Sequence, residues 1–173
     1  MPLQTRKRCP HPRRIAGLIL VLLSFFAAPV FADEADAAAR IKVAYLYNFM
    51  KFIYWPEGSF ADLRLCVLGD PPLARIAAEN MTGRSVRGHN VVVQASEGGG
   101  LDGCHMIYST RPVSAGRAML TVGEGLGFVE NGGMIGFVQV ENRIRFYINL
   151  EAVRAAQLRA DSQLLTSAYD VIK

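Results

Sequence analysis

The first 32 residues have the three zones of a secretory signal peptide, in the order that such peptides require. Five basic residues precede an apolar run over residues 15–26, and no acidic residue occurs before Asp33. The run is about a dozen residues long, whereas a helix needs roughly 20 apolar residues to span a bilayer. Val30 and Ala32 offer small residues for cleavage. We therefore expect export and cleavage near Ala32, with an uncleaved membrane anchor as the alternative.

Loss of this segment leaves residues 33–173 to fold, which is the size of a single domain with a proper hydrophobic core. The whole chain has 19 basic and 15 acidic residues, and five of the basic ones belong to the leader. The exported part therefore has 14 basic against 15 acidic residues and is close to neutral. Because a nucleic-acid-binding domain needs a basic footprint, this class of partner is excluded.

Cys66 and Cys104 are the cysteines that remain, since Cys9 belongs to the leader. Exported proteins meet an oxidising environment, in which two cysteines favour a disulfide bond. The two positions are 38 residues apart, and closing a loop of that size is worth roughly 4 kcal/mol of chain entropy at best. Two buried free thiols are the alternative.

Residues 36–53 contain neither glycine nor proline and begin with an alanine-rich stretch, which favours a helix. Apolar residues wrap most of its circumference outside one narrow stripe, which is formed by Arg40, Ala44, Tyr47, Asn48 and Lys51. A helix this apolar is expected to be buried on more than one side. One side can pack on its own domain and the other on a second copy, so we expect a homodimer.

Short apolar segments then alternate with short helical ones. Strands are predicted at residues 63–68, 91–93, 104–109 and 119–122, and helices at residues 73–80 and 113–118. Short apolar strands joined by helical crossovers are typical of a largely parallel sheet. The predicted fold class is therefore α/β, a layered and mostly parallel sheet with helices on both faces.

The C-terminal part predicts an antiparallel hairpin followed by helices. Residues 134–138 and 144–150 flank a turn around residues 141–142. In the second strand, three residues alternate with the apolar ones and are expected on the other face: Arg143, Arg145 and Tyr147. Asn149 is expected to cap one helix, and Asp161 or Ser162 to cap a last helix that continues through Ile172.

Glycine-rich loops after two of the predicted strands form the candidate ligand site: Gly69 and Asp70, and then Gly123, Gly125 and Gly127. Loops at the carboxyl ends of parallel strands can bind ligands, and glycine lets backbone amides approach a phosphate. The spacing matches neither the dinucleotide fingerprint nor the Walker loop. Tight turns are therefore the alternative to a small-ligand-binding module.

No catalytic or metal-binding pattern stands out in the exported part. Neither a Gly-x-Ser-x-Gly, a His-Glu-x-x-His nor a Cys-x-x-Cys motif occurs. His105 follows Cys104 in a predicted strand, where neighbouring side chains point to opposite faces and do not share a site. We predict no cofactor, no metal ion and no enzymatic activity.

Aromatic and basic residues crowd the end of the first helix. Tyrosine and tryptophan are enriched at protein interfaces, although core packing is the alternative. Together with the outward residues of the hairpin they form the candidate interface, which comprises Tyr47, Lys51, Tyr54, Trp55, Arg143, Arg145 and Tyr147.

Several segments stand in a distinctive order: residues 43–56, residues 65–71, Cys104 with His105, residues 132–137 and residues 144–150. In order and spacing they resemble the YfiR family, also known as the DUF4154 domain. The resemblance covers nearly all of residues 33–173. It implies a periplasmic α/β protein, often dimeric, without known enzymatic activity.

The best-known member of that family represses an inner-membrane diguanylate cyclase by binding its periplasmic domain, and an outer-membrane lipoprotein relieves the repression. The resemblance thus implies such a cyclase, or a related sensor kinase, as the partner, with effects on cyclic-di-GMP and biofilm formation. A lipoprotein is a further implied partner. Cys66 and Cys104 match a structural disulfide of that member, whose second cysteine pair is absent from residues 141–151 here.

Overall fold

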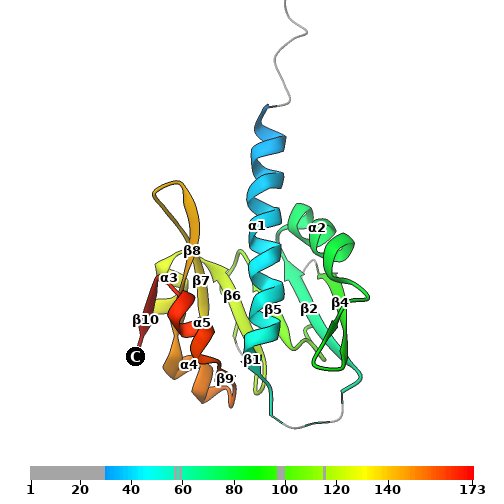
Figure 1. The fold of residues 1–173 in the computed structure, drawn as a ribbon, viewed down its shortest axis with the longest axis vertical. Coiled ribbons are helices and arrows are strands. Elements are labelled where there is room, and N and C mark those ends of the chain that lie inside the picture. Colours follow the sequence, from blue (N-terminus) through cyan, green and yellow to red (C-terminus); the bar gives the residue numbers. More distant parts are fainter. Residues whose placement is uncertain (1–29, 57, 59, 97–99, 115) are drawn as a thin grey trace, which may run out of the picture. The chain divides into compact units, whose positions relative to one another are not determined.

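The computed structural model describes residues 30–56, 58, 60–96, 100–114 and 116–173, and for residues 30–33 the backbone alone. Most of the predicted signal peptide lies outside the described residues, so its cleavage near Ala32 stays a prediction. Residues Glu34–Lys173 form one compact unit of the α/β class that the sequence predicts (Figure 1). None of the helices in the described part combines the length and apolar character that a membrane span requires.

A mixed sheet of eight strands is the centre of this unit, in the order β10-β8-β7-β6-β5-β2-β4-β3. The five neighbours from β7 to β4 run parallel, whereas β3, β8 and β10 run the opposite way. Every strand that the apolar segments predict is present, with slightly different ends. The bounds are β2 Asp62–Leu68, β3 Ser85–Val86, β4 His89–Ser96, β5 Met106–Ser109, β6 Leu120–Glu124, β7 Ile135–Val140, β8 Arg143–Asn149 and β10 Asp170–Ile172.

Helix α1 (Val30–Phe52) crosses one face of the sheet, and α2 (Pro71–Met81) lies beside it (Figure 1). Leu46 and Phe49 of α1 are fully buried. The ring centre of Phe49 lies 4.9 Å from that of Phe146 in β8. The predicted first helix is therefore confirmed, and its apolar side forms the main core with the sheet.

A separate two-stranded ladder follows α1. In it, β1 (Ile53–Tyr54) pairs antiparallel with β9 (Arg159–Ala160). The predicted helix extends to residue 53, but α1 ends at Phe52 because Ile53 already belongs to this ladder. The end of α1 is thereby held against a segment from the far end of the chain.

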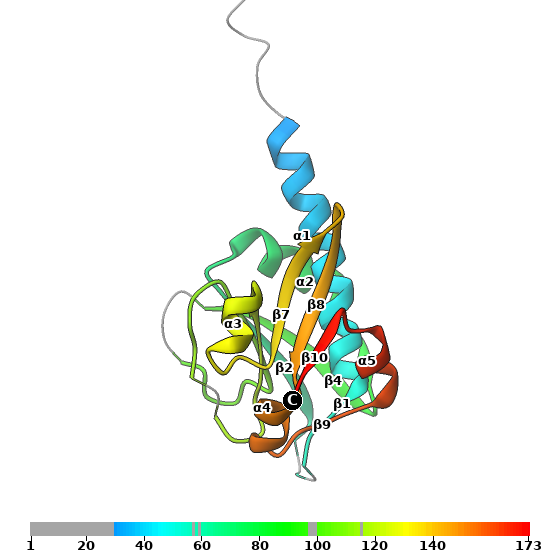
Figure 2. The same cartoon turned by 90° about the vertical axis from the view of Figure 1, so that its left-hand side faces the viewer.

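The opposite face of the sheet is covered by the short helix α3 (Leu126–Glu130) and by loops. Figure 2 shows α3 and α1 on opposite sides of β7 and β8. Phe128 of α3 packs so closely on Gly123 and Gly133 that an added Cβ at either position would collide with its ring. Helices on both faces are thus confirmed, although the second face has only this short one over its centre.

The predicted helix over residues 113–118 is wrong. None of the described residues in this range is helical. Ala118 has a φ of 57°, and its N–H donates a hydrogen bond of 2.9 Å to the carbonyl oxygen of Ala156. Because left-handed backbone cannot continue a right-handed helix, this long-range contact prevails over the helix propensity of alanine.

The predicted hairpin and both predicted caps are confirmed. Strands β7 and β8 pair antiparallel around Glu141 and Asn142, whose positive φ angles of 46° and 62° suit a two-residue hairpin turn. The side chain of Asn149 caps α4 (Leu150–Ala155), and that of Asp161 caps α5 (Ser162–Ser167).

The last helix is shorter than predicted. It ends at Ser167, and Asp170–Ile172 forms β10, which lies parallel to β8. Val171 is aligned with Ile148 in this ladder. The apolar residues Val171 and Ile172 are compatible with either a helix or a strand. Here they form a strand because they pair with the edge of β8.

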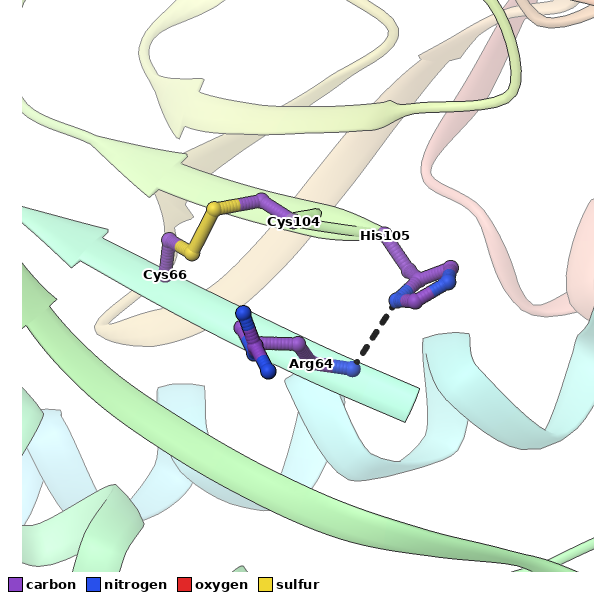
Figure 3. The surroundings of a disulfide bond; sticks show 4 residues. All are labelled: Arg64, Cys66, Cys104 and His105. Carbon is purple, nitrogen blue, oxygen red and sulfur yellow. Dashed lines mark hydrogen bonds between the residues drawn. A yellow bond between two sulfur atoms is a disulfide. The ribbon is translucent and has the colours of Figure 1, made fainter. Parts of the chain in front are cut away.

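A disulfide bond joins Cys66 in β2 to Cys104, which precedes β5 (Figure 3). Their Cα atoms are 5.9 Å apart, within the usual range for such a bond. Both cysteines are buried and pack with Leu68 and Ile107 in a small apolar cluster. The bond closes the part of the chain that contains α2, β3 and β4.

Candidate functional site

Tyr54, in the ladder after α1, is covered by two arginine side chains from distant parts of the chain. The guanidinium carbon of Arg87 lies 3.5 Å from the centre of the Tyr54 ring, and that of Arg159 lies 3.9 Å from it. The Tyr54 hydroxyl donates a hydrogen bond of 3.1 Å to Oδ2 of Asp161. We call these four residues the Tyr54 cluster.

Asp161 of the Tyr54 cluster is kept in its charged form by its hydrogen bonds and by the neighbouring arginines. The N–H of Gln163 donates to the Asp161 carboxylate, and this bond, the Tyr54 hydroxyl and the two arginines hold the pKa of Asp161 below its usual value. Asp161 is therefore ionised and balances one of the two guanidinium groups. Stacking on the Tyr54 ring orients both arginines before any partner arrives.

Two more cations lie next to the Tyr54 cluster, around Tyr47 of α1. The Lys51 Nζ atom lies 5.9 Å from the centre of the Tyr47 ring, and the guanidinium carbon of Arg84 lies 5.3 Å from it. Arg87 donates a hydrogen bond of 2.8 Å to the carbonyl oxygen of Lys51, which links the two groups. We call the whole set the basic aromatic surface; it comprises Tyr47, Lys51, Arg84 and the four residues of the Tyr54 cluster.

The basic aromatic surface contains three of the predicted interface residues, namely Tyr47, Lys51 and Tyr54. Its three arginines, Arg84, Arg87 and Arg159, are not among the predicted interface residues. They belong to the β3–β4 region and to β9, and only the tertiary fold brings them to α1. All four cationic side chains are exposed, whereas the two tyrosines are half-buried.

Trp55 lies beside this surface but has a structural contact of its own. Its Nε1–H donates a hydrogen bond of 3.1 Å to the carbonyl oxygen of His105. Trp55 also lines a hollow of about 270 Å³ together with Tyr54, Phe60 and Arg87. The hollow gives the basic aromatic surface an adjoining apolar recess.

The hairpin residues of the predicted interface lie elsewhere. In β8, Phe146 and Ile148 face the core under α1, so the alternating residues Arg145 and Tyr147 lie on the other face of the sheet. The Tyr147 ring centre is 5.4 Å from that of Tyr169, which is 48% exposed. The structure therefore divides the predicted interface into two surfaces on opposite faces.

Several residues of the predicted glycine-rich loops already have contacts within the fold. The Gly125 amide donates a hydrogen bond of 2.7 Å to the carbonyl oxygen of Phe137, and Gly123 is packed under Phe128. Asp70 caps α2 by accepting a hydrogen bond of 2.9 Å from the N–H of Leu73. Among the described residues no group of three or more His, Cys, Asp or Glu could hold a metal ion.

Comparison with known families adds the decisive observation: the sequence model described as YfiR/HmsC-like matches residues 39–169. The chain belongs to the YfiR/HmsC-like family. No curated protein matches the chain. The YfiR/HmsC-like family is periplasmic, and its domain is regulatory rather than catalytic. The match includes both cysteines of the disulfide and every residue of the basic aromatic surface.

His105 of this YfiR/HmsC-like domain is held as a neutral acceptor. Its Nδ1 atom accepts a hydrogen bond of 3.1 Å from the backbone N–H of Arg64 (Figure 3). Its ring centre lies 4.2 Å from that of Phe60, which also stacks on His89. Burial, the Arg64 guanidinium and His89 together lower the pKa of His105 below its usual value.

Acidification is expected to destabilise the YfiR/HmsC-like domain through His105. Unfolding restores the ordinary pKa of about 6.5, so the unfolded state takes up the proton first as the pH falls. The stability is fully present above that pH and declines as the pH falls towards the lower folded pKa. Melting temperatures of wild type and His105→Asn between pH 8 and pH 5 test this, since asparagine keeps an acceptor without titrating. Equal declines in the two proteins would contradict the assignment.

Proposed function

We propose that this chain is a periplasmic signalling regulator that represses an inner-membrane diguanylate cyclase, or a related sensor such as a kinase, by protein contact. The observation that carries the proposal is the basic aromatic surface within a YfiR/HmsC-like domain. This domain class fits a periplasmic regulator of a diguanylate cyclase. The contact would act on cyclic-di-GMP synthesis and hence on biofilm formation.

The composition of the basic aromatic surface favours protein binding. Arginine and tyrosine dominate the energetics of protein interfaces, and Arg87 and Arg159 are already oriented by the Tyr54 ring. Less side-chain entropy is then lost on binding. With four cations and one carboxylate, the basic aromatic surface is positively charged. We expect an acidic surface on the partner, because complementary charge raises association rates and favours the correct partner.

The second predicted surface is compatible with this contact. The residues Arg145 and Tyr147 lie with Tyr169 on the face of the sheet away from α1. Self-association through the hairpin, in place of the α1 contact that the sequence predicts, would therefore leave the basic aromatic surface free for the cyclase. An outer-membrane lipoprotein that competes for the basic aromatic surface would relieve the repression.

Deletion of the gene is expected to raise cellular cyclic-di-GMP and biofilm mass, because a repressor is lost. A copy that encodes the wild-type chain should restore both, and a copy with Arg87→Gln and Arg159→Gln should not. A copy with Arg75→Gln and Lys173→Gln is the matched control, since it removes the same charge away from the surface. Unchanged cyclic-di-GMP after deletion would contradict the proposal.

A further inference from the structure

The order of the strands reverses between β2 and β5. From β2 the chain passes through α2 to β4 on one side, and then to β5, β6 and β7 on the other. The carboxyl ends of β2 and β5 are followed by Gly69 and Asp70 and by Thr110 and Arg111. In open α/β sheets, the crevice outside such a reversal is where ligands bind.

Two hollows meet at Arg111 in this crevice. One is about 280 Å³ and is lined by Arg111 with Thr110, Val113, Glu124 and Phe128. The other is about 330 Å³ and is lined by Arg111 with Val67, Gly69, Asp70 and Ala74. Each therefore has an apolar wall next to the same cationic side chain, which is the composition expected of a small-molecule site.

The two carboxylates of the crevice have partners of their own. Glu124 forms an ion pair of 2.7 Å with Lys42 of α1 and accepts a hydrogen bond from the buried Tyr108 hydroxyl. Asp70 caps α2 and lies 3.5 Å from the same hydroxyl. Burial, Glu124 and Asp70 raise the pKa of Tyr108, so its hydroxyl stays protonated and donates. Both carboxylates are thus held in place.

Arg111 differs from these groups. Within the part of the chain that the structure describes, its guanidinium makes neither a hydrogen bond nor an ion pair. Its Nε atom lies 3.9 Å from the position that a Cβ on Gly69 would occupy, so the side chain rests along the β2 end of the crevice. A cation is therefore available where the two hollows adjoin.

We propose that Arg111 binds the carboxylate of a small organic acid, whose apolar part lies in the first hollow against Val113 and Phe128. A guanidinium fork matches a carboxylate with two parallel hydrogen bonds. Glu124 and Asp70 flank the site and oppose the second charge of a phosphate dianion, so a singly charged acid is preferred. This inference stands on the crevice alone and does not rest on the proposed repression.

Phenylacetate is a suitable probe, with phenylacetamide as its uncharged analogue and inorganic phosphate as the competing anion. Isothermal titration of the exported protein should show millimolar or tighter binding of phenylacetate and at least tenfold weaker binding of the other two. Absence of phenylacetate binding at 10 mM, or equal binding of phenylacetamide or phosphate, would overturn the proposal.

Variants locate the site. Arg111→Gln should weaken phenylacetate binding at least tenfold, and Arg111→Lys should restore part of it, while Arg75→Gln should leave it unchanged. Gly127→Leu adds a side chain at the rim of the first hollow, where no atom lies within 4 Å of an added Cβ. It should weaken phenylacetate binding without lowering the melting temperature. Unchanged affinity in both Arg111→Gln and Gly127→Leu would place the binding elsewhere and refute the inference.

Discussion

Replacing both Cys66 and Cys104 with alanine is expected to lower the free energy of unfolding by about 4 kcal/mol. The disulfide closes a loop of sequence separation 38 that includes α2, β3 and β4. Without the bond, the unfolded chain regains the freedom of this loop, whereas the folded chain keeps the same ladders. Denaturant unfolding of the oxidised wild type and of the double variant measures the difference.

Single replacements and chemical reduction serve as controls. Cys66→Ala should lose about as much stability as the double variant, since either change removes the same bond. Reduction of the wild type with a phosphine should lower its stability to that of the double variant and should leave the double variant unaffected. A loss below 1 kcal/mol in the double variant would show that the bond is not the main restraint on this loop.

Neutralising Arg87 and Arg159 together is expected to weaken binding to the membrane partner by about 100-fold or more, as for two residues that dominate an interface. Both guanidinium groups lie on the Tyr54 ring and are exposed. Arg87→Gln with Arg159→Gln removes two charges and both stacking contacts while the core stays untouched. The loss should come mostly as faster dissociation, with some slowing of association in low salt.

The matched control for this double variant is Arg75→Gln with Lys173→Gln, which changes the net charge equally. Arg75 forms ion pairs with Asp36 and Glu79 at exposed positions, where such pairs contribute little stability. Both double variants should melt within a few degrees of the wild type. Equal weakening of partner binding in the two would mean that overall charge, rather than the basic aromatic surface, governs the contact.

Local signals in the sequence predict most of the fold. The largely apolar stretch of α1 without glycine or proline, the short apolar strands and the caps Asn149 and Asp161 all depend on residues near each other in the chain. The structure departs from prediction where a distant contact prevails. The N–H of Ala118 donates a hydrogen bond to Ala156, so the helix at 113–118 does not form. Val171 pairs with Ile148 of β8, so the last helix ends before it.

The candidate site is predictable only in part. Tyr47 and Lys51 lie in the last turns of α1 and Tyr54 follows in β1, so their aromatic and basic character is visible in one short stretch of the sequence. Of the arginines that complete the surface, Arg84 precedes β3, Arg87 lies in the β3–β4 turn and Arg159 belongs to β9. The two-residue ladder of β1 with β9 has no sequence signal of its own. Arg145 and Tyr147 are likewise a basic and an aromatic residue, but they lie on the face of the sheet away from α1.

The most direct measurement is a crosslinked pull-down with residues 33–173 as bait on membranes of the source cells, repeated with both double variants. We expect the wild type and the Arg75→Gln, Lys173→Gln control to recover a diguanylate cyclase or sensor kinase of the inner membrane. The Arg87→Gln, Arg159→Gln variant should not recover it. Recovery of the same membrane protein by all three chains, or of no such protein by the wild type, would contradict the proposed function.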